Sequence, residues 1–191
     1  MERRKRLSED ALLGRDQTPF PAPTTSRPHD LILLDRDGTL NVHRPGYISS
    51  PAELRLLPGA ANAVRQLNAL GAVVIVVTNQ RGLATGALTA EQLVKVHRSL
   101  EERLARDGAH LDGIHVCPHD VGECRCRKPL PGLLEQALKR APWAQVHRCL
   151  LLGDQPSDLA AAAALGIPAK QVGGSTVGSL QGCVRQLLNT D

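Results

Sequence analysis

The stretch LILLDRDGTLN, from Leu31 to Asn41, constrains the fold of this chain more than any other part of the sequence. Its four leading apolar residues predict a strand that is buried on both faces of a parallel sheet. Asp35 and Asp37 follow that strand directly, at the end where open α/β sheets bind ligands. If the extended path continues, both side chains point to the same side of the strand. Such a pair can hold Mg²⁺, and one carboxylate can attack a phosphoryl group.

An ordinary turn is the simpler interpretation of Asp37 and Gly38, because Asp-Gly turns after strands are common. The longer string D-x-D-G-T-x-N is far more specific than that dipeptide. Gly38 would let the chain turn away sharply after the two carboxylates. We therefore interpret this stretch as the centre of a phosphate-handling site.

The rest of the chain alternates apolar strand patterns with amphipathic helix patterns. We expect further strands at 72–78, 113–117, 148–152 and 169–172, and helices at 60–70, from about Thr89 to Leu104, and at 129–140, 159–165 and 179–188. This alternation predicts an α/β fold, a doubly wound parallel sheet with right-handed crossovers. Residues 42–57 are expected to form a loop at the active end of the sheet.

Composition limits the class of protein and the number of domains. Only 2% of the 191 residues are aromatic while 42% are hydrophobic, so the core must be aliphatic. No apolar run approaches the ~20 residues of a membrane span, so we expect no membrane partner. We expect residues 1–30 to be a disordered tail, with a possible short helix at 8–13, and residues 31–191 to be one domain. The net charge of +4 suits anionic substrates without establishing nucleic-acid binding.

Further polar residues lie at the ends of predicted strands or just before predicted helices. Thr78-Asn79-Gln80 ends a central strand, and its hydroxyl and amides can donate to phosphate oxygens. Lys128 precedes a predicted helix and can neutralise phosphate charge, although a basic loop residue is usually only surface charge. Asp154 at a strand end supplies a further carboxylate for Mg²⁺. Asp158 is expected to support the site or to cap a helix.

Three cysteines and a histidine lie between residues 117 and 126. Cys117, His119, Cys124 and Cys126 match a tetrahedral Cys₃His zinc site in which the protein supplies every ligand, so the zinc would be structural. The alternative is a set of reduced cysteines beside a surface histidine. Five cysteines are an odd number, which argues against a disulfide framework and for a reducing compartment, the cytoplasm.

These motifs together resemble those of a known family. D-x-D-G-T-x-N, T-N-Q, R-K-P and G-D resemble the four motifs of the haloacid dehalogenase (HAD) superfamily of phosphatases. The string C-P-H followed by C-x-C-R-K-P is similar to that of D-glycero-D-manno-heptose 1,7-bisphosphate phosphatases. It is more distantly similar to that of histidinol-phosphate phosphatases. The resemblance covers about residues 31–175 and implies a HAD-like fold without a large cap domain, with a zinc-stapled loop.

The resemblance also implies roles for individual residues. Asp35 would be the nucleophile and Asp37 the general acid and base. The catalytic set implied is Asp35, Asp37, Thr78 and Lys128; the Mg²⁺ ligands are Asp35, the Asp37 backbone carbonyl and Asp154; and the zinc ligands are Cys117, His119, Cys124 and Cys126. The substrate contacts implied are Arg44, Pro45, Gly46, Tyr47, Asn79, Gln80, Arg81 and Arg127.

The expected activity is Mg²⁺-dependent hydrolysis of the C7 phosphate of the heptose bisphosphate through an aspartyl-phosphate. The partner is then a small phosphorylated sugar, and we expect a monomer. A histidinol-phosphate phosphatase, or another small sugar-phosphate phosphatase, is the nearest alternative. A nucleic-acid 3′-phosphatase shares the first motif, but the zinc loop argues against it by resemblance. A catalytically inactive HAD-fold binding module is disfavoured because every acidic and basic catalytic position is present.

Overall fold

The computed structural model describes residues 18–173 and 178–189 of the chain. The described residues form one five-stranded sheet in the order β3-β2-β1-β4-β5, in which every neighbouring pair is parallel. The strands are β1 (Leu31–Leu34), β2 (Val73–Asn79), β3 (Gly113–Cys117), β4 (Cys149–Gly153) and β5 (Ala169–Gln171). The predicted doubly wound parallel sheet is thereby confirmed, with β1 at its centre.

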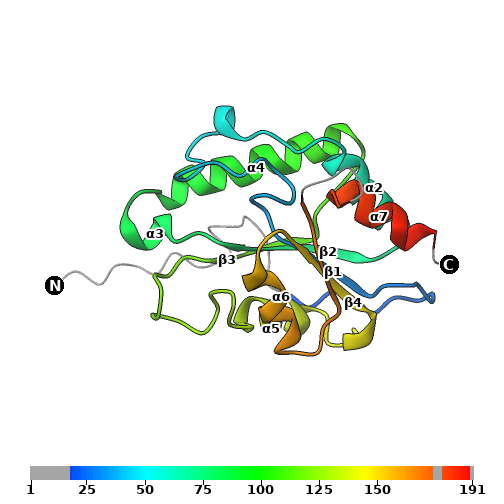
Figure 1. Cartoon of the computed structure of the whole chain (residues 1–191). Coiled ribbons are helices and arrows are strands. Elements are labelled where there is room, and N and C mark those ends of the chain that lie inside the picture. The colour runs from blue at the N-terminus through cyan, green and yellow to red at the C-terminus, as the bar shows by residue number, and fades with distance from the viewer. Residues whose placement is uncertain (1–17, 174–177, 190–191) are drawn as a thin grey trace.

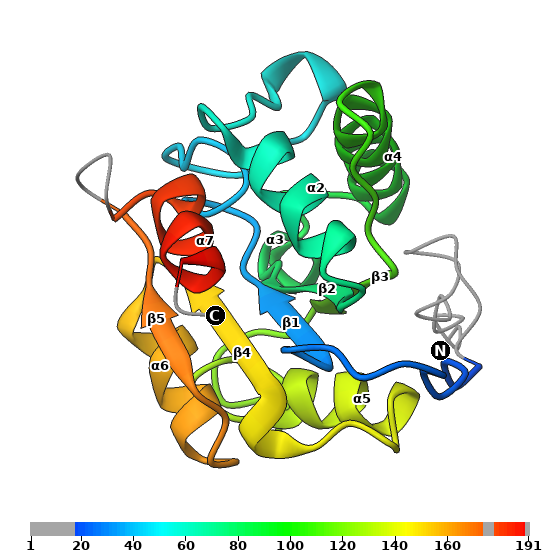
Figure 2. The ribbon, with the colours of Figure 1, turned by 90° about the vertical axis from the view of Figure 1, so that its right-hand side faces the viewer.

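Helices cover both faces of this sheet (Figure 1). The longer helices are α2 (Ala60–Ala69), α4 (Ala90–Arg106), α5 (Gly132–Arg140), α6 (Pro156–Ala163) and α7 (Leu180–Leu188). Short helical turns are η1 (Pro51–Glu53), α3 (Gly82–Thr85) and η2 (Val146–Arg148). Figures 1 and 2 show α2, α4 and α7 on one face and α5 and α6 on the other. Parallel strands connected through helices require this three-layer arrangement.

Side chains along each strand point alternately to the two faces of the sheet, and this divides the core into two apolar layers. Ile32 and Leu34 pack into the layer with α2, α4 and α7, whereas Leu31 and Leu33 pack into the layer with α5 and α6. All four side chains are fully buried. Successive strand residues point to opposite faces, so a strand that is covered on both sides must be apolar throughout.

Two helices begin three residues away from their predicted starts, and one short helix was not predicted. Helix α5 begins at Gly132 and not at residue 129, because a turn closed by the Leu130 amide on the Arg127 carbonyl precedes it. Helix α6 begins at Pro156 and not at residue 159, since Gln155 and Asp158 form a capping box around its first turn. Helix α3 is a single turn that the sequence reading did not include.

The prediction of a disordered tail up to residue 30 is wrong for residues 18–30. The Phe20 amide donates to the Arg140 carbonyl (2.6 Å), and Trp143 Nε1 donates to the Phe20 carbonyl (2.9 Å). The Arg140 guanidinium lies 4.1 Å from the centroid of the Phe20 ring. A low-complexity segment is therefore held by one aromatic anchor and its backbone. Residues 1–17, with the possible helix at 8–13, lie outside the described residues.

No cap domain is inserted between the strands in the part of the chain that the structure describes, as expected. The described helices also include none that is long and apolar enough to cross a bilayer. Without a cap domain, the walls of a site at the sheet edge come from loops, strand ends and the first turns of helices.

Candidate active site and metal centres

Carboxylates from three chain segments converge at the carboxyl edge of the sheet. Asp35 follows β1, Asp154 follows β4, and Asp158 lies in the first turn of α6. One oxygen of each lies within 4.8 Å of one oxygen of each of the others, and we call these three residues the acidic site. The parallel pairing of β1 with β4 makes this meeting possible, because both strands end at the same edge.

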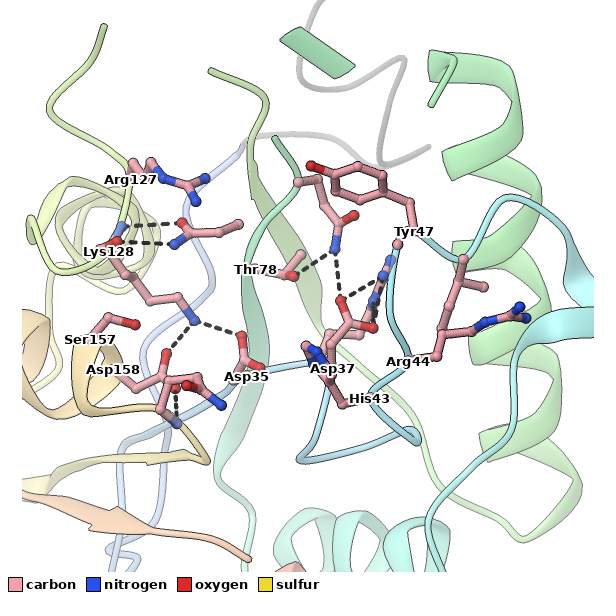
Figure 3. Close-up of a pocket in the computed structure, with 16 residues that line it drawn as sticks. Asp35, Asp37, His43, Arg44, Tyr47, Thr78, Arg127, Lys128, Ser157 and Asp158 are labelled. Carbon is pink, nitrogen blue, oxygen red and sulfur yellow. Dashed lines mark hydrogen bonds and ion pairs between the residues drawn. The ribbon is translucent and has the colours of Figure 1, made fainter. Parts of the chain in front are cut away.

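Lys128 enters the acidic site from the loop before α5 (Figure 3). Its ammonium lies 2.6 Å from Asp35 Oδ1 and 2.5 Å from Asp158 Oδ1, and it donates to the Val77 carbonyl at 2.7 Å. The lysine is only 4% exposed. A buried ammonium costs several kcal/mol unless carboxylates pair with it, so its position is closely determined.

Burial and charge act in opposite directions on these groups. Burial raises the pKa of Asp35 to about 6, while the Lys128 ammonium opposes that rise and Asp158 adds to it. Burial lowers the pKa of Lys128, but the two carboxylates more than offset this and raise it. The charges of Asp35 and Lys128 therefore offset part of the cost of burying each other.

Asp37 also lies beside the pocket, but its carboxylate is turned away from the acidic site. It accepts hydrogen bonds from Arg36 Nη2 (2.7 Å), Asn41 Nδ2 (2.9 Å) and Gln80 Nε2 (3.0 Å). Burial raises the pKa of Asp37, yet Arg36 and these donors lower it below the ordinary value overall. If Asp37 binds a cation, its backbone carbonyl is the group that remains for this purpose, as the sequence suggested.

The acidic site fits a hard divalent cation on two observations. Asp154 Oδ1 is buried and has no hydrogen-bond partner among the described residues. Gly38 has φ +88°, and a Cβ at this position would clash with the Asp154 carboxylate, so only glycine leaves this space open. Oxygen ligands with an unused lone pair are the donors that Mg²⁺ prefers.

A pocket of about 310 Å³ opens above Asp35 and Asp37 (Figure 3). Seven of the expected catalytic and substrate residues besides these two line it: Arg44, Gly46, Tyr47, Thr78, Asn79, Gln80 and Lys128. Arg127 lines it as well, and Arg127 Nη1 is buried without a hydrogen-bond partner among the described residues. An unpaired buried guanidinium nitrogen beside a cavity indicates a site for an anionic group of a ligand.

Two expected substrate contacts do not line this pocket. Pro45 is exposed on the loop, and its neighbours Arg44 and Gly46 face the cavity in its place. Arg81 Nε lies 2.5 Å from Asp120 Oδ1, and Arg81 is absent from the lining residues. The prediction that Pro45 and Arg81 contact the substrate is therefore not supported, because each side chain points elsewhere.

The sequence reading also missed residues that the fold brings to the site. His43, Gln155 and Ser157 line the pocket, although nothing in their local sequence marked them. His97 lies on α4 and contacts Arg36 from 61 positions away. Asp158, expected as a support or a cap, does both: it pairs with Lys128 and accepts from the Gln155 amide.

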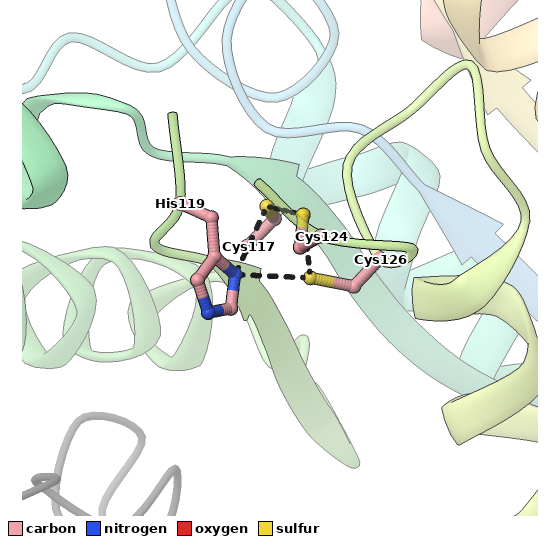
Figure 4. Close-up of side chains that lie close together, drawn as sticks. All are labelled: Cys117, His119, Cys124 and Cys126. Atoms are coloured by element: carbon pink, nitrogen blue, oxygen red, sulfur yellow. Dashed lines mark hydrogen bonds between the residues drawn. The ribbon is translucent and has the colours of Figure 1, made fainter. Parts of the chain in front are cut away.

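The three cysteines and the histidine meet in the loop between β3 and α5 (Figure 4). We call Cys117, His119, Cys124 and Cys126 the Cys/His cluster. Cys124 Sγ lies 3.6 Å from Cys117 Sγ and 3.4 Å from Cys126 Sγ, and His119 Nδ1 lies 3.8 Å from Cys117 Sγ and 3.3 Å from Cys126 Sγ. All five cysteines of the chain are described and free of disulfides. Cys149 and Cys183 are buried core residues, as predicted.

These distances fit a tetrahedral ion. A tetrahedron with metal–sulfur bonds of ~2.3 Å has sulfur–sulfur edges of about 3.8 Å, close to the observed separations. A disulfide would need ~2.05 Å instead. The hydrogen bond from Cys126 lowers the pKa of Cys117 to about 5, which favours the thiolate form that metals bind. The Cys/His cluster can therefore hold a metal ion.

The comparison with protein families decides the class of this molecule. The family model described as haloacid dehalogenase-like hydrolase matches residues 41–166. The chain belongs to this family of hydrolases. The predicted family is thereby confirmed, and the parallel sheet described above agrees with the predicted fold class.

Named relatives narrow the family further. The D-glycero-alpha-D-manno-heptose-1,7-bisphosphate 7-phosphatase of Mycobacterium bovis is 39% identical over 156 residues, 78% of this chain and 82% of the relative. The D-glycero-beta-D-manno-heptose-1,7-bisphosphate 7-phosphatase of Rhodopseudomonas palustris is 38% identical over 144 residues, 71% of this chain and 79% of the relative. This HAD hydrolase is thus similar to enzymes named for both anomers.

A solved structure of the same HAD type was determined with ligands. The crystal structure of D,D-heptose 1,7-bisphosphate phosphatase from B. bronchiseptica, complexed with magnesium and phosphate, matches with a TM-score of 0.77. It is 33% identical, and the match covers 85% of this chain and 99% of that chain. The likeness therefore extends over most of this chain.

Proposed function

We propose that this chain is a Mg²⁺-dependent phosphatase that removes the C7 phosphate of D-glycero-D-manno-heptose 1,7-bisphosphate. The observation that supports it most is the buried contact between Asp35 and Lys128 at the pocket, 2.6 Å long, beside the unpaired Asp154 oxygen. A nucleophile, a fixed cation and a cation site are the parts that phosphoryl transfer to a carboxylate needs. The names of the relatives supply the substrate.

The first half of the reaction would form an aspartyl-phosphate. An oxygen of Asp35 attacks phosphorus, and the bond from phosphorus to the C7 oxygen of the sugar breaks. Asp37 gives its proton to that leaving oxygen. A bound phosphate dianion beside Asp37 raises the proton affinity of this carboxyl, which favours the acid form that the step needs.

The second half would release phosphate and restore Asp35. Asp37, now a carboxylate, takes a proton from water, and the water oxygen attacks phosphorus while the bond to Asp35 breaks. Lys128, Thr78 and Asn79 lie around the pocket where they can donate to phosphate oxygens in both halves. Val77 and Asp158 would keep the Lys128 ammonium in place, while its third donor, which contacts Asp35 in the free protein, turns to a phosphate oxygen.

We propose separate tasks for the two metal centres. Asp35, Asp154 and the Asp37 carbonyl would hold Mg²⁺, which offsets the repulsion between a carboxylate nucleophile and a phosphate dianion. The Cys/His cluster would hold zinc with all four positions filled by protein, so that the ion fixes the loop and takes no part in chemistry. Cys126 directly precedes Arg127 and Lys128, so a fixed loop also fixes these two cations.

We propose that the enzyme acts as a monomer, because the groups that the reaction above uses all belong to this chain. The free thiols of the Cys/His cluster suit a reducing compartment, and we propose that the enzyme works in the cytoplasm.

Turnover of defined substrates tests the proposal. We expect kcat/KM for the α or β anomer of the heptose 1,7-bisphosphate to exceed kcat/KM for histidinol phosphate on the same preparation. Phosphorus NMR should show loss of the C7 phosphate and retention of the C1 phosphate. If histidinol phosphate is the better substrate, the heptose assignment fails while the phosphatase chemistry survives.

Arg127 is our candidate for recognition of the remote C1 phosphate, because it lines the pocket and its Nη1 is buried without a hydrogen-bond partner among the described residues. Arg127→Ala should raise KM for the heptose bisphosphate about tenfold, the value of one charged hydrogen bond, and leave p-nitrophenyl phosphate almost unchanged. Arg81→Ala is the matched control, since Arg81 is an arginine of the same region that pairs with Asp120. Equal effects of both variants would remove Arg127 from this role.

A further inference from the structure

Arg36, the middle residue of the D-R-D string, is a buried arginine that the chemistry above leaves without a task. It is 1% exposed and is among the largest fully buried side chains. Its Nη2 donates to both oxygens of Asp37, at 2.7 Å and 3.0 Å, and its Nε lies 3.3 Å from Asp37 Oδ1. A two-pronged contact of this kind fixes the orientation of a carboxylate as well as its charge.

The other end of the Arg36 guanidinium meets helix α4. Nη1 of Arg36 lies 3.0 Å from Nε2 of His97, a residue that is 2% exposed. Arginine can only donate, so Nε2 must accept and the ring must be neutral with its proton on Nδ1. Burial, and after it the Arg36 charge, lower the pKa of His97 well below the ordinary value, in agreement with a neutral ring.

We infer that His97 is a positioning residue of the reaction, which acts through Arg36 to hold the Asp37 carboxyl where it delivers its proton to the leaving group. The inference rests on the proposed acid role of Asp37. His97 touches neither the pocket nor the substrate space, and it does not line the cavity. Its link to the chemistry is one continuous set of contacts from α4 to the pocket.

Alternative explanations for His97 are weaker. A histidine that only filled the core would be replaceable by an apolar side chain of similar size, since such positions tolerate hydrophobic exchange. Here an apolar replacement would leave the Nη1 donor of a permanently charged arginine buried and unsatisfied. The guanidinium would then shift toward other acceptors, and Asp37 would shift with it.

Leaving groups provide the test, because they separate proton delivery from the rest of the reaction. Nitrophenolate leaves without much proton help, whereas phenolate needs more. For His97→Leu we expect kcat/KM with phenyl phosphate to fall about tenfold, a part of the 10²–10⁴-fold that general acid help supplies. The fall with p-nitrophenyl phosphate should be about twofold or less. kcat/KM is the quantity to compare, because it reports the steps up to phosphoryl transfer.

Two further variants separate positioning from loss of stability. His97→Gln keeps an acceptor oxygen for Arg36 and should restore most of the phenyl phosphate activity. His115→Gln is the matched control: His115 is also 2% exposed, but it lies on β3 with Gln136 as its partner. It should leave the ratio between the two substrates unchanged even if it lowers the melting temperature.

The outcomes distinguish this inference from the proposed function. Asp37→Asn should show the same leaving-group dependence as His97→Leu in stronger form. If Asp37→Asn lowers kcat/KM for phenyl phosphate and for p-nitrophenyl phosphate by the same factor, the proposed acid role of Asp37 is wrong. The positioning role of His97 is overturned if Asp37→Asn lowers kcat/KM more for phenyl phosphate than for p-nitrophenyl phosphate and His97→Leu does not. It is also overturned if His97→Gln loses as much phenyl phosphate activity as His97→Leu.

Discussion

The acidic site and the Cys/His cluster are both suited to metal ions, but they are built differently. The acidic site takes one carboxylate each from the ends of β1 and β4 and from the first turn of α6, and Lys128 already occupies two of its oxygens. The Cys/His cluster takes all its ligands from one short segment, residues 117–126, which begins with the last residue of β3. One site depends on the whole sheet, and the other depends on a short piece of chain.

The two sites also differ in whether a bound ion could contact a substrate. Hard oxygens with one lone pair unused leave room for Mg²⁺ and a phosphate at the same ion. Three sulfurs and one nitrogen at tetrahedral spacing leave no open position. A catalytic ion that exchanges and a structural ion that stays are therefore expected within one small molecule.

Removal of the nucleophile should have the largest effect. We expect Asp35→Asn to abolish phosphatase activity with every substrate while the circular dichroism spectrum and the metal content of the Cys/His cluster stay unchanged. The side chains are nearly isosteric, but an amide oxygen cannot form the aspartyl-phosphate. Turnover close to that of the wild type would show that another group attacks phosphorus.

The second largest effect is expected from removal of metal ions, which should affect the acidic site and leave the Cys/His cluster loaded. Brief dialysis against EDTA should stop turnover, and added Mg²⁺ but not Zn²⁺ should restore it. Elemental analysis of the same dialysed sample should still find one zinc per chain, because a closed Cys₃His site releases its ion slowly. Purified protein without any zinc would contradict the structural site, and full activity without any metal would contradict the magnesium site.

A smaller effect on activity is expected from substitution of a ligand in the Cys/His cluster. Cys124→Ser should lose zinc and lower selectivity between the heptose bisphosphate and p-nitrophenyl phosphate, because the loop carries Arg127 and Lys128. It should lower the melting temperature less than a core substitution such as Leu33→Ala, which removes fully buried volume. A Cys124→Ser variant with normal zinc content would show that the cluster is not the site.

The smallest effect should come from a lower pH, which should reduce the free energy of unfolding through His115, two residues before Cys117. Burial lowers the pKa of His115 to about 4, from near 6.5 in an unfolded chain. The unfolded chain therefore binds the extra proton first, and stability is lost as the pH falls from about 6.5 toward 4, by at most ~3 kcal/mol. Urea unfolding of the wild type at pH 7.5 and pH 5 measures this loss.

His115→Gln controls for the metal ligands, since it keeps all four of them. Its free energy of unfolding should fall less between pH 7.5 and pH 5 than that of the wild type. Parallel losses in the two proteins would mean that the fall in pH acts on groups other than His115.

Much of the fold followed from local patterns. The buried run of β1 and the β-branched run of β2 predicted central parallel strands, because a strand covered on both faces must be apolar throughout. The Thr89 capping box marked the start of α4. The tail was mistaken because one phenylalanine in a polar, proline-rich segment is too little for a periodic signal, although it is enough to anchor the chain at Trp143.

The sequence by itself was enough to predict the Cys/His cluster, and to place Asp35 and Asp37 together after a buried strand, because each of these groups lies within one short segment of the chain. Only the tertiary structure decided which distant side chains join them. The contacts of Arg36 with His97, of Arg81 with Asp120 and of Lys128 with Asp158 depend on how loops and helices pack at one sheet edge. Contacts between side chains far apart in sequence have no periodicity to detect, so charge and burial decide them only once the sheet has brought them together.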